Sequence, residues 1–304
     1  MFFVTYEYNK STNSGVLTED KTSIIPLGTA EEYYLGTNEL NLSLLEIIKK
    51  GDRLVNKVSE IISKVENDQS CPFLIGIEEV SLKAPIPRPE KNIFCLGKNY
   101  KEHALEFEQT SDEEIAIPKY PVIFSKAVTS VTHPGEPIFS HRDITQAVDY
   151  EAELAVVIGK SGSNITKENF MDHIFGFTII NDITARDLQK KHSQWHKGKS
   201  LDTFAPMGPY LVHKSAVPNF DNLDIKCTVN GEIRQHSNTS KLIFDIPTTI
   251  SILSEGMTLD PGDIIATGTP AGVGMGFNPP RYLQPGDTVE VEISGLGVLK
   301  NRVI

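Results

Sequence analysis

The residues best suited to chemistry lie in the stretch VDYEAELAVVIG (Val148 to Gly159), where carboxylates lead directly into an apolar run. In an extended strand successive side chains alternate between two faces, so Glu151 and Glu153 point the same way. No basic residue stands between Val148 and Ile158. Two like charges this close are unfavourable unless a cation or a shared proton offsets them. The spacing therefore indicates a cation site.

A third carboxylate, Asp182, follows a second strand-like run, IFGFTII (Ile174 to Ile180). Glu151, Glu153 and Asp182 together make a candidate metal site with three carboxylates. Sites built only from oxygen ligands suit hard cations, so Mg²⁺ or Mn²⁺ is expected and zinc is disfavoured. The alternative is three solvated acids at strand ends, and spacing alone does not decide between the two.

A possible acid–base pair lies upstream, after the strand-like NIFCLG (Asn92 to Gly97). Asn99 can cap a short helix that carries His103 and Glu106. Residues three apart are neighbours on a helix, so the carboxylate can orient the imidazole and stabilise its charge. The alternative is an exposed ion pair on a surface helix. The acidic segment from 109 to 120 is expected to be a mobile loop.

Further polar candidates come from a strand that ends in a lysine and from a long polar run, Thr184 to Pro209, which is expected to be a functional loop. These candidates are Lys126, Arg186, Gln189 and Lys199. His192 and His196 show the spacing of a zinc helix, but Ser193 stands where the zinc-protease motif has its Glu, so both are interpreted as loop residues.

A glycine-rich stretch, ATGTPAGVGMG (Ala266 to Gly276), opens no apparent helix. A phosphate cradle needs a helix at that point, so this function is disfavoured. The stretch is expected to bring backbone close to a small ligand, with hydroxyls from Thr267 and Thr269.

Length and composition describe a globular protein: 304 residues, 39% hydrophobic and 23% charged. The net charge of −11 and the lack of a Lys/Arg cluster argue against nucleic acid as a partner. Three widely spaced cysteines indicate reduced thiols in a cytosol, without a disulfide. No basic leader and no long apolar run is present, so we expect a cytoplasmic protein without a membrane partner.

The chain divides at APIPRP, where proline at every second position predicts an extended linker. We expect a small N-terminal domain (1–83), a linker (84–90) and a larger domain (91–304). The first begins with strands at 2–8 and 23–27, and a helix follows with Asp52 as its N-cap after Gly51. In the second, Asn230-Gly231 predicts a hairpin, Pro247 and Gly256 bound a helix, and strands are expected at 263–267 and 288–293.

These segments, in this order, resemble the fumarylacetoacetate hydrolase family. The similarity is to its bacterial two-domain members, which include oxaloacetate decarboxylases, acylpyruvate hydrolases and hydroxymuconate isomerases. It covers the chain after the linker, while the first 80 or so residues match only a small variable domain. The matching segments are LGKNYKEHALEF, PVIFSK, DYEAELAVVIGK, GFTIINDITARDLQ, GKSLDTFAPMGP, VNGEIRQ and DIIATGTPAGVG.

The resemblance implies an α+β fold: a mixed β-roll catalytic domain with a small α+β N-terminal domain, usually as a homodimer. It implies Mg²⁺ or Mn²⁺ on the three carboxylates, with Lys199 beside the metal. The residues that it places against the substrate are Lys126, Arg186, Gln189 and Thr269. It puts His103 and Glu106 on a lid, where they activate a water or move protons.

The implied reaction is cleavage of a C–C bond in a small 2-oxo (di)carboxylic acid, through an enolate that the metal stabilises. Oxaloacetate decarboxylation and hydrolysis of the acylpyruvate or fumarylacetoacetate type both fit. A lid pair favours cleavage over keto–enol isomerisation of the 2-hydroxymuconate type, which stays open. A metal-binding regulatory protein without catalysis is a third hypothesis, and the intact Lys199, His103 and Glu106 argue against it. Three carboxylates and one divalent cation sum to −1, so Lys199, Arg186 and Lys126 are expected to offset the substrate's charge.

Overall fold

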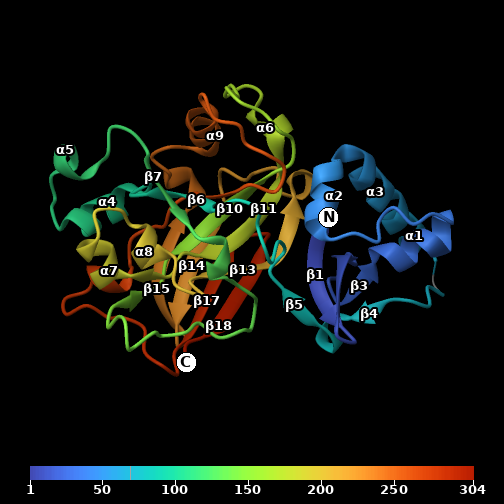
Figure 1. The fold of residues 1–304 in the computed structure, drawn as a ribbon, viewed down its shortest axis with the longest axis horizontal. Coiled ribbons are helices and arrows are strands. Elements are labelled where there is room, and N and C mark those ends of the chain that lie inside the picture. Colours follow the sequence, from blue (N-terminus) through green and yellow to red (C-terminus); the bar gives the residue numbers. More distant parts are fainter. Residues whose placement is uncertain (69) are drawn as a thin grey trace.

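A twelve-stranded mixed sheet runs through the whole molecule in the computed structural model, which describes residues 1–68 and 70–304 (Figure 1). Its order is β4-β3-β2-β1-β13-β11-β10-β16-β6-β7, with β5 beside β1 and β8 beside β13. The β13–β8 and β16–β6 pairs are parallel and the others antiparallel. Its strands are β1 (Phe2–Tyr8), β2 (Ser11–Leu17), β3 (Ser23–Pro26), β4 (Ile75–Gly76), β5 (Ser81–Lys83), β6 (Ile93–Gly97), β7 (Val122–Lys126), β8 (Val131–Thr132), β10 (Ala152–Ile158), β11 (Ile174–Asn181), β13 (Ala205–His213) and β16 (Ile264–Ala266).

A second, antiparallel sheet packs against β10, β11 and β13. It has the order β15-β14-β17-β18, and its strands are β14 (Asp224–Val229), β15 (Glu232–Asn238), β17 (Thr288–Ile293) and β18 (Gly297–Arg302). Asn230 and Gly231 both have positive φ, 52° and 80°, as the predicted Asn-Gly hairpin requires. The main core lies between the two sheets and includes Leu154, Phe177 and Val291. The predicted α+β fold with a mixed β-roll is therefore confirmed.

The helices lie outside the sheets, with α1–α3 at one end of the molecule and α4 and α5 at the other (Figure 1). They are α1 (Leu27–Leu35), α2 (Leu44–Lys50), α3 (Asp52–Glu66), α4 (Lys101–Glu108), α5 (Glu113–Ala116), α6 (Phe170–His173), α7 (Arg186–Lys191), α8 (His196–Lys199) and α9 (Ile246–Ser254). Single 3₁₀ turns cover Ile77–Glu79, Val128–Ser130, Lys214–Ala216, Thr239–Lys241 and Gly274–Gly276. A short two-stranded pair, β9 (Val148–Asp149) and β12 (Thr184–Ala185), completes the fold.

Several local predictions were wrong. Asp52 is the first residue of α3 rather than its cap, and Gly51 occupies the cap position. Asn99 does not cap α4, because its side-chain nitrogen donates to the backbone oxygens of Phe244 and Thr267. The run from 184 to 209 contains β12, α7 and α8 rather than a continuous loop, and α8 begins at His196. The segment from 109 to 120 contains α5.

The first 83 residues share a sheet and a core with the rest of the chain. Residues 84–92 contain no helix or strand, yet β1 pairs with β13 through Phe2↔Val212 and Phe3↔Leu211. Phe3 packs in one core cluster with Cys95 and Phe175 from beyond residue 90. The division at residues 84–90 stays a prediction, and the two sides of it are joined through both hydrogen bonds and apolar contacts.

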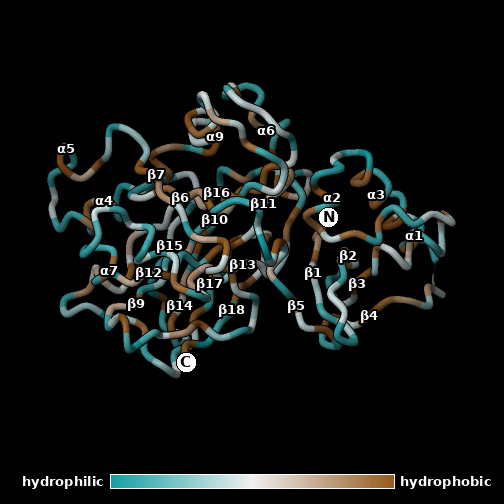
Figure 2. Tube along the Cα trace, in the orientation of Figure 1, coloured by the Kyte–Doolittle hydropathy of each residue, from teal (hydrophilic) through white to brown (hydrophobic). Residues whose placement is uncertain are grey.

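The surface has the polar character that its charge predicts, and Figure 2 shows hydrophilic stretches mainly along the outer loops. Among the described residues, no helix combines the length and the apolar character needed to cross a membrane. All three cysteines are free thiols, with Cys95 and Cys227 buried and Cys71 half-buried.

Candidate metal centre

Two neighbouring antiparallel strands bring the three predicted carboxylates together. The β10 residues Leu154 and Val156 pack into the core between the sheets, so Glu153 and the preceding Glu151 face the opposite side. Asp182 directly follows β11, and its backbone N–H donates to the Glu151 carbonyl at 2.8 Å. One oxygen from each of the three side chains lies within 4.8 Å of the others.

The three acids are buried rather than solvated at strand ends. Glu151, Glu153 and Asp182 are 4%, 1% and 0% exposed. Burying three like charges is costly unless cations offset them. The hypothesis of solvated acids is therefore excluded, and the buried acids require positive charge beside them.

Three positively charged side chains contact this cluster, and they bond to Glu151 and Asp182 but not to Glu153. Lys199 Nζ lies 2.7 Å from Glu151 Oε2 and 2.6 Å from Asp182 Oδ2. Lys126 Nζ donates to Asp182 Oδ1 at 2.5 Å, and Arg186 Nη2 lies 2.6 Å from Glu151 Oε1. Among the described residues, Glu153 is bonded to no cation, and its Oε2 accepts only the N–H of Gly268 at 2.8 Å.

The electrostatics follow from this uneven pairing. Burial raises the pKa of Glu153 well above its usual value, and the charges of Asp182 and Glu151 raise it further. Burial alone would also raise the pKa of Glu151, but the charges of Lys199 and Arg186 outweigh it and lower that pKa to about 2. Glu153 therefore has no positively charged side chain bonded to it. A site with three buried carboxylates, one of them without a bonded cation, fits a hard divalent cation.

His103 and Glu106 face each other on α4. His103 is 3% exposed, and its Nδ1 lies 3.0 Å from Glu106 Oε2, while Glu106 Oε1 accepts the N–H of Gly272 at 3.0 Å. A carboxylate only accepts hydrogen bonds, so Nδ1 carries a proton, and in the neutral form of the ring Nε2 has a lone pair. The pair is therefore not an exposed surface ion pair, and its free nitrogen can accept a proton.

A small cavity lies between His103 and the carboxylates of Glu151 and Glu153. An aromatic wall closes one side, where Trp195 packs against Phe107 and Phe124 with ring centroids 5.5 and 5.2 Å away. The predicted site residues that line the cavity are His103, Glu151, Glu153, Arg186, Gln189, Lys199 and Thr269.

Three of the predicted site residues, Lys126, Glu106 and Asp182, do not line the cavity. Lys126, expected against the substrate, does not line the cavity but holds Asp182 and the Ile183 carbonyl from behind, at 2.5 and 3.0 Å. Glu106 lies behind His103. Two lining residues are held in turn by hydrogen bonds: Gln189 Oε1 accepts from Arg186 at 3.1 Å, and Thr269 Oγ1 accepts from Gln235 at 2.7 Å.

Asp149 is a site residue that the sequence analysis did not select. Its buried carboxylate accepts from Arg186 Nε at 2.8 Å and from the backbone N–H groups of Tyr150, Gly274 and Met275. Its place two residues before Glu151 was a signal that could have identified it. Gln235 was also missed, and nothing in its local sequence shows that it bonds to the N–H of Ala152 and to Thr269.

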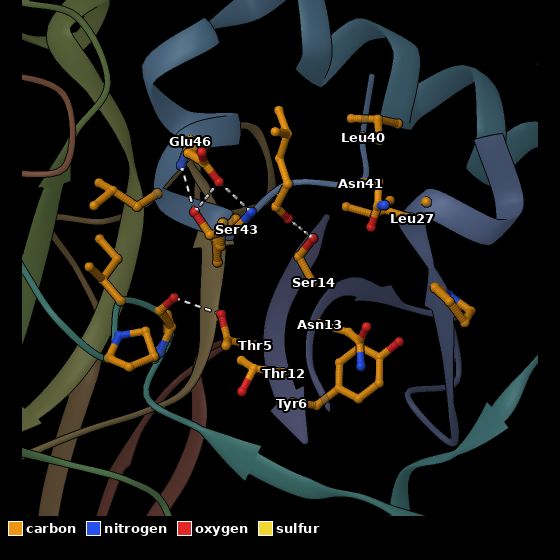
Figure 3. Close-up of a pocket in the computed structure, with 18 of the residues that line it drawn as sticks. Thr5, Tyr6, Thr12, Asn13, Ser14, Leu27, Leu40, Asn41, Ser43 and Glu46 are labelled. Atoms are coloured by element: carbon orange, nitrogen blue, oxygen red, sulfur yellow. Dashed lines mark hydrogen bonds between the residues drawn. The ribbon is translucent and has the colours of Figure 1, made fainter. Parts of the chain in front are cut away.

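A larger cavity, of about 1330 Å³, lies in the N-terminal part of the chain (Figure 3). Residues from β1, β2 and the proline-rich segment line it, and Glu46 accepts there from Ser43 in a helix cap. Among the described residues, the one acid cluster with metal-site geometry is Glu151, Glu153 and Asp182, in the smaller cavity. Because reactions need such groups, we place the chemistry in the smaller cavity.

Comparison with known proteins identifies the family. The model of the fumarylacetoacetate (FAA) hydrolase C-terminal region matches residues 92–304. The chain belongs to the fumarylacetoacetate hydrolase family and is an enzyme of that family. The oxaloacetate tautomerase YisK of Bacillus subtilis is 47% identical over 305 residues, which cover 100% of both chains.

Two solved structures of family members share the fold. The fumarylacetoacetate hydrolase of Exiguobacterium antarcticum has a TM-score of 0.82 at 38% identity, over 100% of this chain and 99% of that one. The maleylpyruvate hydrolase of Sphingobium sp. SYK-6, solved with manganese(II) and pyruvate, has a TM-score of 0.77 at 27% identity, over 100% and 99%. The buried triad here is consistent with a divalent metal of that kind.

Proposed function

We propose that this enzyme catalyses the keto–enol tautomerisation of a small 2-oxo dicarboxylic acid, with oxaloacetate as the first substrate to test. The observation that carries the proposal is the cavity itself. It has the buried His103 on one wall and two acids of the carboxylate triad, Glu151 and Glu153, on another. When a base and a cation site face the same small space, the base can remove a proton from the carbon next to a carbonyl group while the cation stabilises the enolate.

Glu151, Glu153 and Asp182 would hold Mg²⁺ or Mn²⁺, as the manganese in the related maleylpyruvate hydrolase supports. When bound, the ion supplies positive charge that polarises the 2-oxo group and favours enolate formation. Lys199 neutralises Glu151 and Asp182 and orients both.

His103 performs the proton transfer in this proposal. Its Nε2 takes the proton from C3, the electrons of that C–H bond form the C2–C3 double bond, and the C2–O π electrons move to oxygen. The imidazolium then gives its Nε2 proton to the C2 oxygen, which yields the enol and the neutral ring. Glu106 accepts the Nδ1–H throughout and stabilises the imidazolium, and Gly272 in turn holds Glu106. The aromatic wall of Phe107, Phe124 and Trp195 excludes water from the cavity.

Two observations favour proton transfer over the C–C cleavage that the lid pair suggests from sequence alone. The relative that is 47% identical over the whole chain is named an oxaloacetate tautomerase. The cavity is also narrow, which favours a compact four-carbon acid over a larger substrate.

Lys98 is the side chain that we assign to binding the second carboxylate of such a substrate. Among the described residues, it is the lining cation that bonds to none of the metal-site acids, because Arg186 and Lys199 are both engaged with them. Lys98 pairs instead with Glu108 on α4 and lies 4.9 Å from the Phe107 ring centre. It can therefore bind the distal carboxylate of a dicarboxylic acid.

The test follows two products from one substrate. Enol oxaloacetate is added to protein loaded with Mn²⁺, its ultraviolet absorbance is followed as the enol decays, and pyruvate is assayed with lactate dehydrogenase. Tautomerisation gives rapid loss of the enol without pyruvate. Enol decay at the rate of buffer containing Mn²⁺ alone would refute the proposal.

Cleavage is the second candidate, because the His103–Glu106 pair could equally activate a water or protonate an enolate after decarboxylation. Pyruvate released at the rate of enol loss would support decarboxylation. Acetylpyruvate or fumarylpyruvate consumed faster than oxaloacetate would support hydrolysis.

A further inference from the structure

A second cleft, distant from the metal centre, has strongly basic walls. It has a volume of about 700 Å³ and lies where the α2–α3 corner meets the loop after β10 and the end of β13. Four lysines line it, from both sides of the proline-rich segment: Lys49, Lys50, Lys160 and Lys214. In a protein with a net charge of −11, such a concentration of lysines is unusual.

The acidic groups in the cleft do not cancel this charge. Asp52 and Asp172 also line it, which leaves a sum of +2 from four lysines and two aspartates. Within the described part of the chain, Lys50 and Lys160 form no ion pair, and Lys49 pairs with Glu90 outside the cleft. The charge of Lys50 and Lys160 is thus available to a ligand.

The fifteen-residue helix α3 begins in the same cleft. Gly51 occupies its cap position and offers no side chain, so no side-chain oxygen caps the first turn. The free N–H groups and the dipole of a helix N-terminus favour an anion. Asp52 in the first turn offsets part of this field.

A buried histidine supplies an independent observation. His213 lines the cleft and is 8% exposed, and its Nδ1 lies 2.9 Å from Ser215 Oγ and accepts from the N–H of Ser215 at 3.3 Å. The proton of the neutral ring is therefore on Nε2. That N–H has no hydrogen-bond partner among the described residues, so it is free to donate to a ligand in the cleft.

We propose that this cleft binds a small multivalent oxyanion of the phosphate type, either free or as a monoester. Lys50 and Lys160 supply the charge, and the His213 Nε2–H and the first amides of α3 supply directed donors. The ligand would contact elements on both sides of residues 84–90, and so would hold the N-terminal part against the larger part. The proposal is independent of the reaction at the metal centre.

The test is calorimetric titration of the full-length protein, loaded with Mg²⁺, with inorganic phosphate and separately with glycerol 3-phosphate at low ionic strength. We expect saturable binding at one site, weakened about tenfold or more in Lys50→Gln/Lys160→Gln, since two charge-assisted contacts are lost. A preference for one titrant identifies the source. Lys10→Gln/Lys167→Gln, which removes two exposed lysines outside the cleft, is the control for net charge.

Two further variants distinguish binding in this cleft from binding at the metal centre or to the surface charge. His213→Leu should weaken binding several-fold, and His213→Gln, which keeps a side-chain donor, should restore most of it. Binding should persist in Glu151→Ala, whose metal centre is disabled. Non-saturable heats, equal affinity in the Lys50/Lys160 and control variants, or loss of binding in Glu151→Ala would each overturn the proposal.

Discussion

Replacing Glu153 with Gln should have opposite effects on stability with and without metal. Glu153 is the triad member that lacks a cation among the described residues, and burial with two neighbouring carboxylates raises its pKa. In the metal-free protein its charge is a penalty, and in the loaded protein it is a ligand. Gln keeps the shape and still accepts the N–H of Gly268, so Glu153→Gln changes little but the charge.

The magnitude follows from the distances. Two unit charges 4.8 Å apart interact by about 3.5 kcal/mol at an effective dielectric of 20. Glu153 faces two such neighbours, Glu151 and Asp182, and the nearby Lys199 offsets about one of them. The metal-free variant should therefore be more stable than the wild type by on the order of 3 kcal/mol at neutral pH.

The sign of the pH dependence gives a second check. The folded pKa of Glu153 is raised above its ordinary 4.5, so the folded state holds this proton more tightly than the unfolded state. Below pH 4.5 both states are protonated and the penalty is absent. As the pH rises, the penalty grows until the folded group ionises. The advantage of Glu153→Gln should therefore be larger at pH 7.5 than at pH 5.

The assay is urea unfolding of protein treated with a chelator, at both pH values, repeated with excess Mn²⁺. At 100 times its Kd the ion should stabilise the wild type by about 2.7 kcal/mol, and the variant should lose most of this gain. Glu19→Gln, an exposed position, is the matched control and should change stability by less than about 0.5 kcal/mol. A metal-free Glu153→Gln less stable than the wild type, or one that keeps the full gain from Mn²⁺, would refute the reasoning.

Three other variants test the same geometry. His103→Gln should lower the tautomerisation rate by about 10²- to 10⁴-fold, because the proton acceptor is lost, while calorimetry finds unchanged Mn²⁺ affinity. Lys98→Met should raise KM for oxaloacetate about tenfold and leave the binding of monocarboxylic pyruvate unchanged; equal losses for both would contradict its assignment to the distal carboxylate. Burial, with nearby positive charge, lowers the pKa of His213 from 6.5 to about 4. As the pH falls, His213 is therefore protonated in the unfolded chain before it is protonated in the folded one. Its contribution to the free energy of unfolding should fall by about 2 kcal/mol between pH 7.5 and 5. Urea unfolding should show no such fall in His213→Gln.

The strands that carry the triad could be predicted because their sequence pattern is strong. The runs that form β10 and β11 are mostly apolar, and each acid lies within or directly beside one of them. Antiparallel pairing then places Ala152 opposite Asn181, which brings Glu151 beside Asp182. Spacing and alternation predicted that the acids lie together, and their burial in the structure then excluded solvated acids.

Partnerships between distant segments could not be predicted in the same way. The assignment of Lys199 to the metal centre came from the family resemblance, and its simultaneous contacts with Glu151 and Asp182 depend on α8, a helix of four residues. Helices this short carry no periodic signal, so the run from 184 to 209 was predicted as loop. The polar strand β2 (STNSGVL) was missed for a related reason, because its pairing with β1 and β3 forms it despite its weak propensity.

The glycine-rich segment shows how the parts of the site are coordinated. Sequence predicted that its backbone approaches a ligand, and in the structure its backbone approaches carboxylates. Gly268 donates to Glu153, Gly272 to Glu106 and Gly274 to Asp149. One segment thus bonds to a metal-site acid, to the partner of the base and to the partner of Arg186.

Close approach explains the glycines in this segment. A Cβ at position 272 would lie 1.9 Å from the Arg234 carbonyl oxygen, and one at position 276 would lie 1.9 Å from Glu106 Oε1. Gly268 and Gly272 also have positive φ, 99° and 102°, which side chains disfavour. Because the same backbone bonds to both α4 and β10, a displacement of α4 would also shift the donors to the metal-site acids. This segment therefore connects the position of the base to the charge balance of the metal centre.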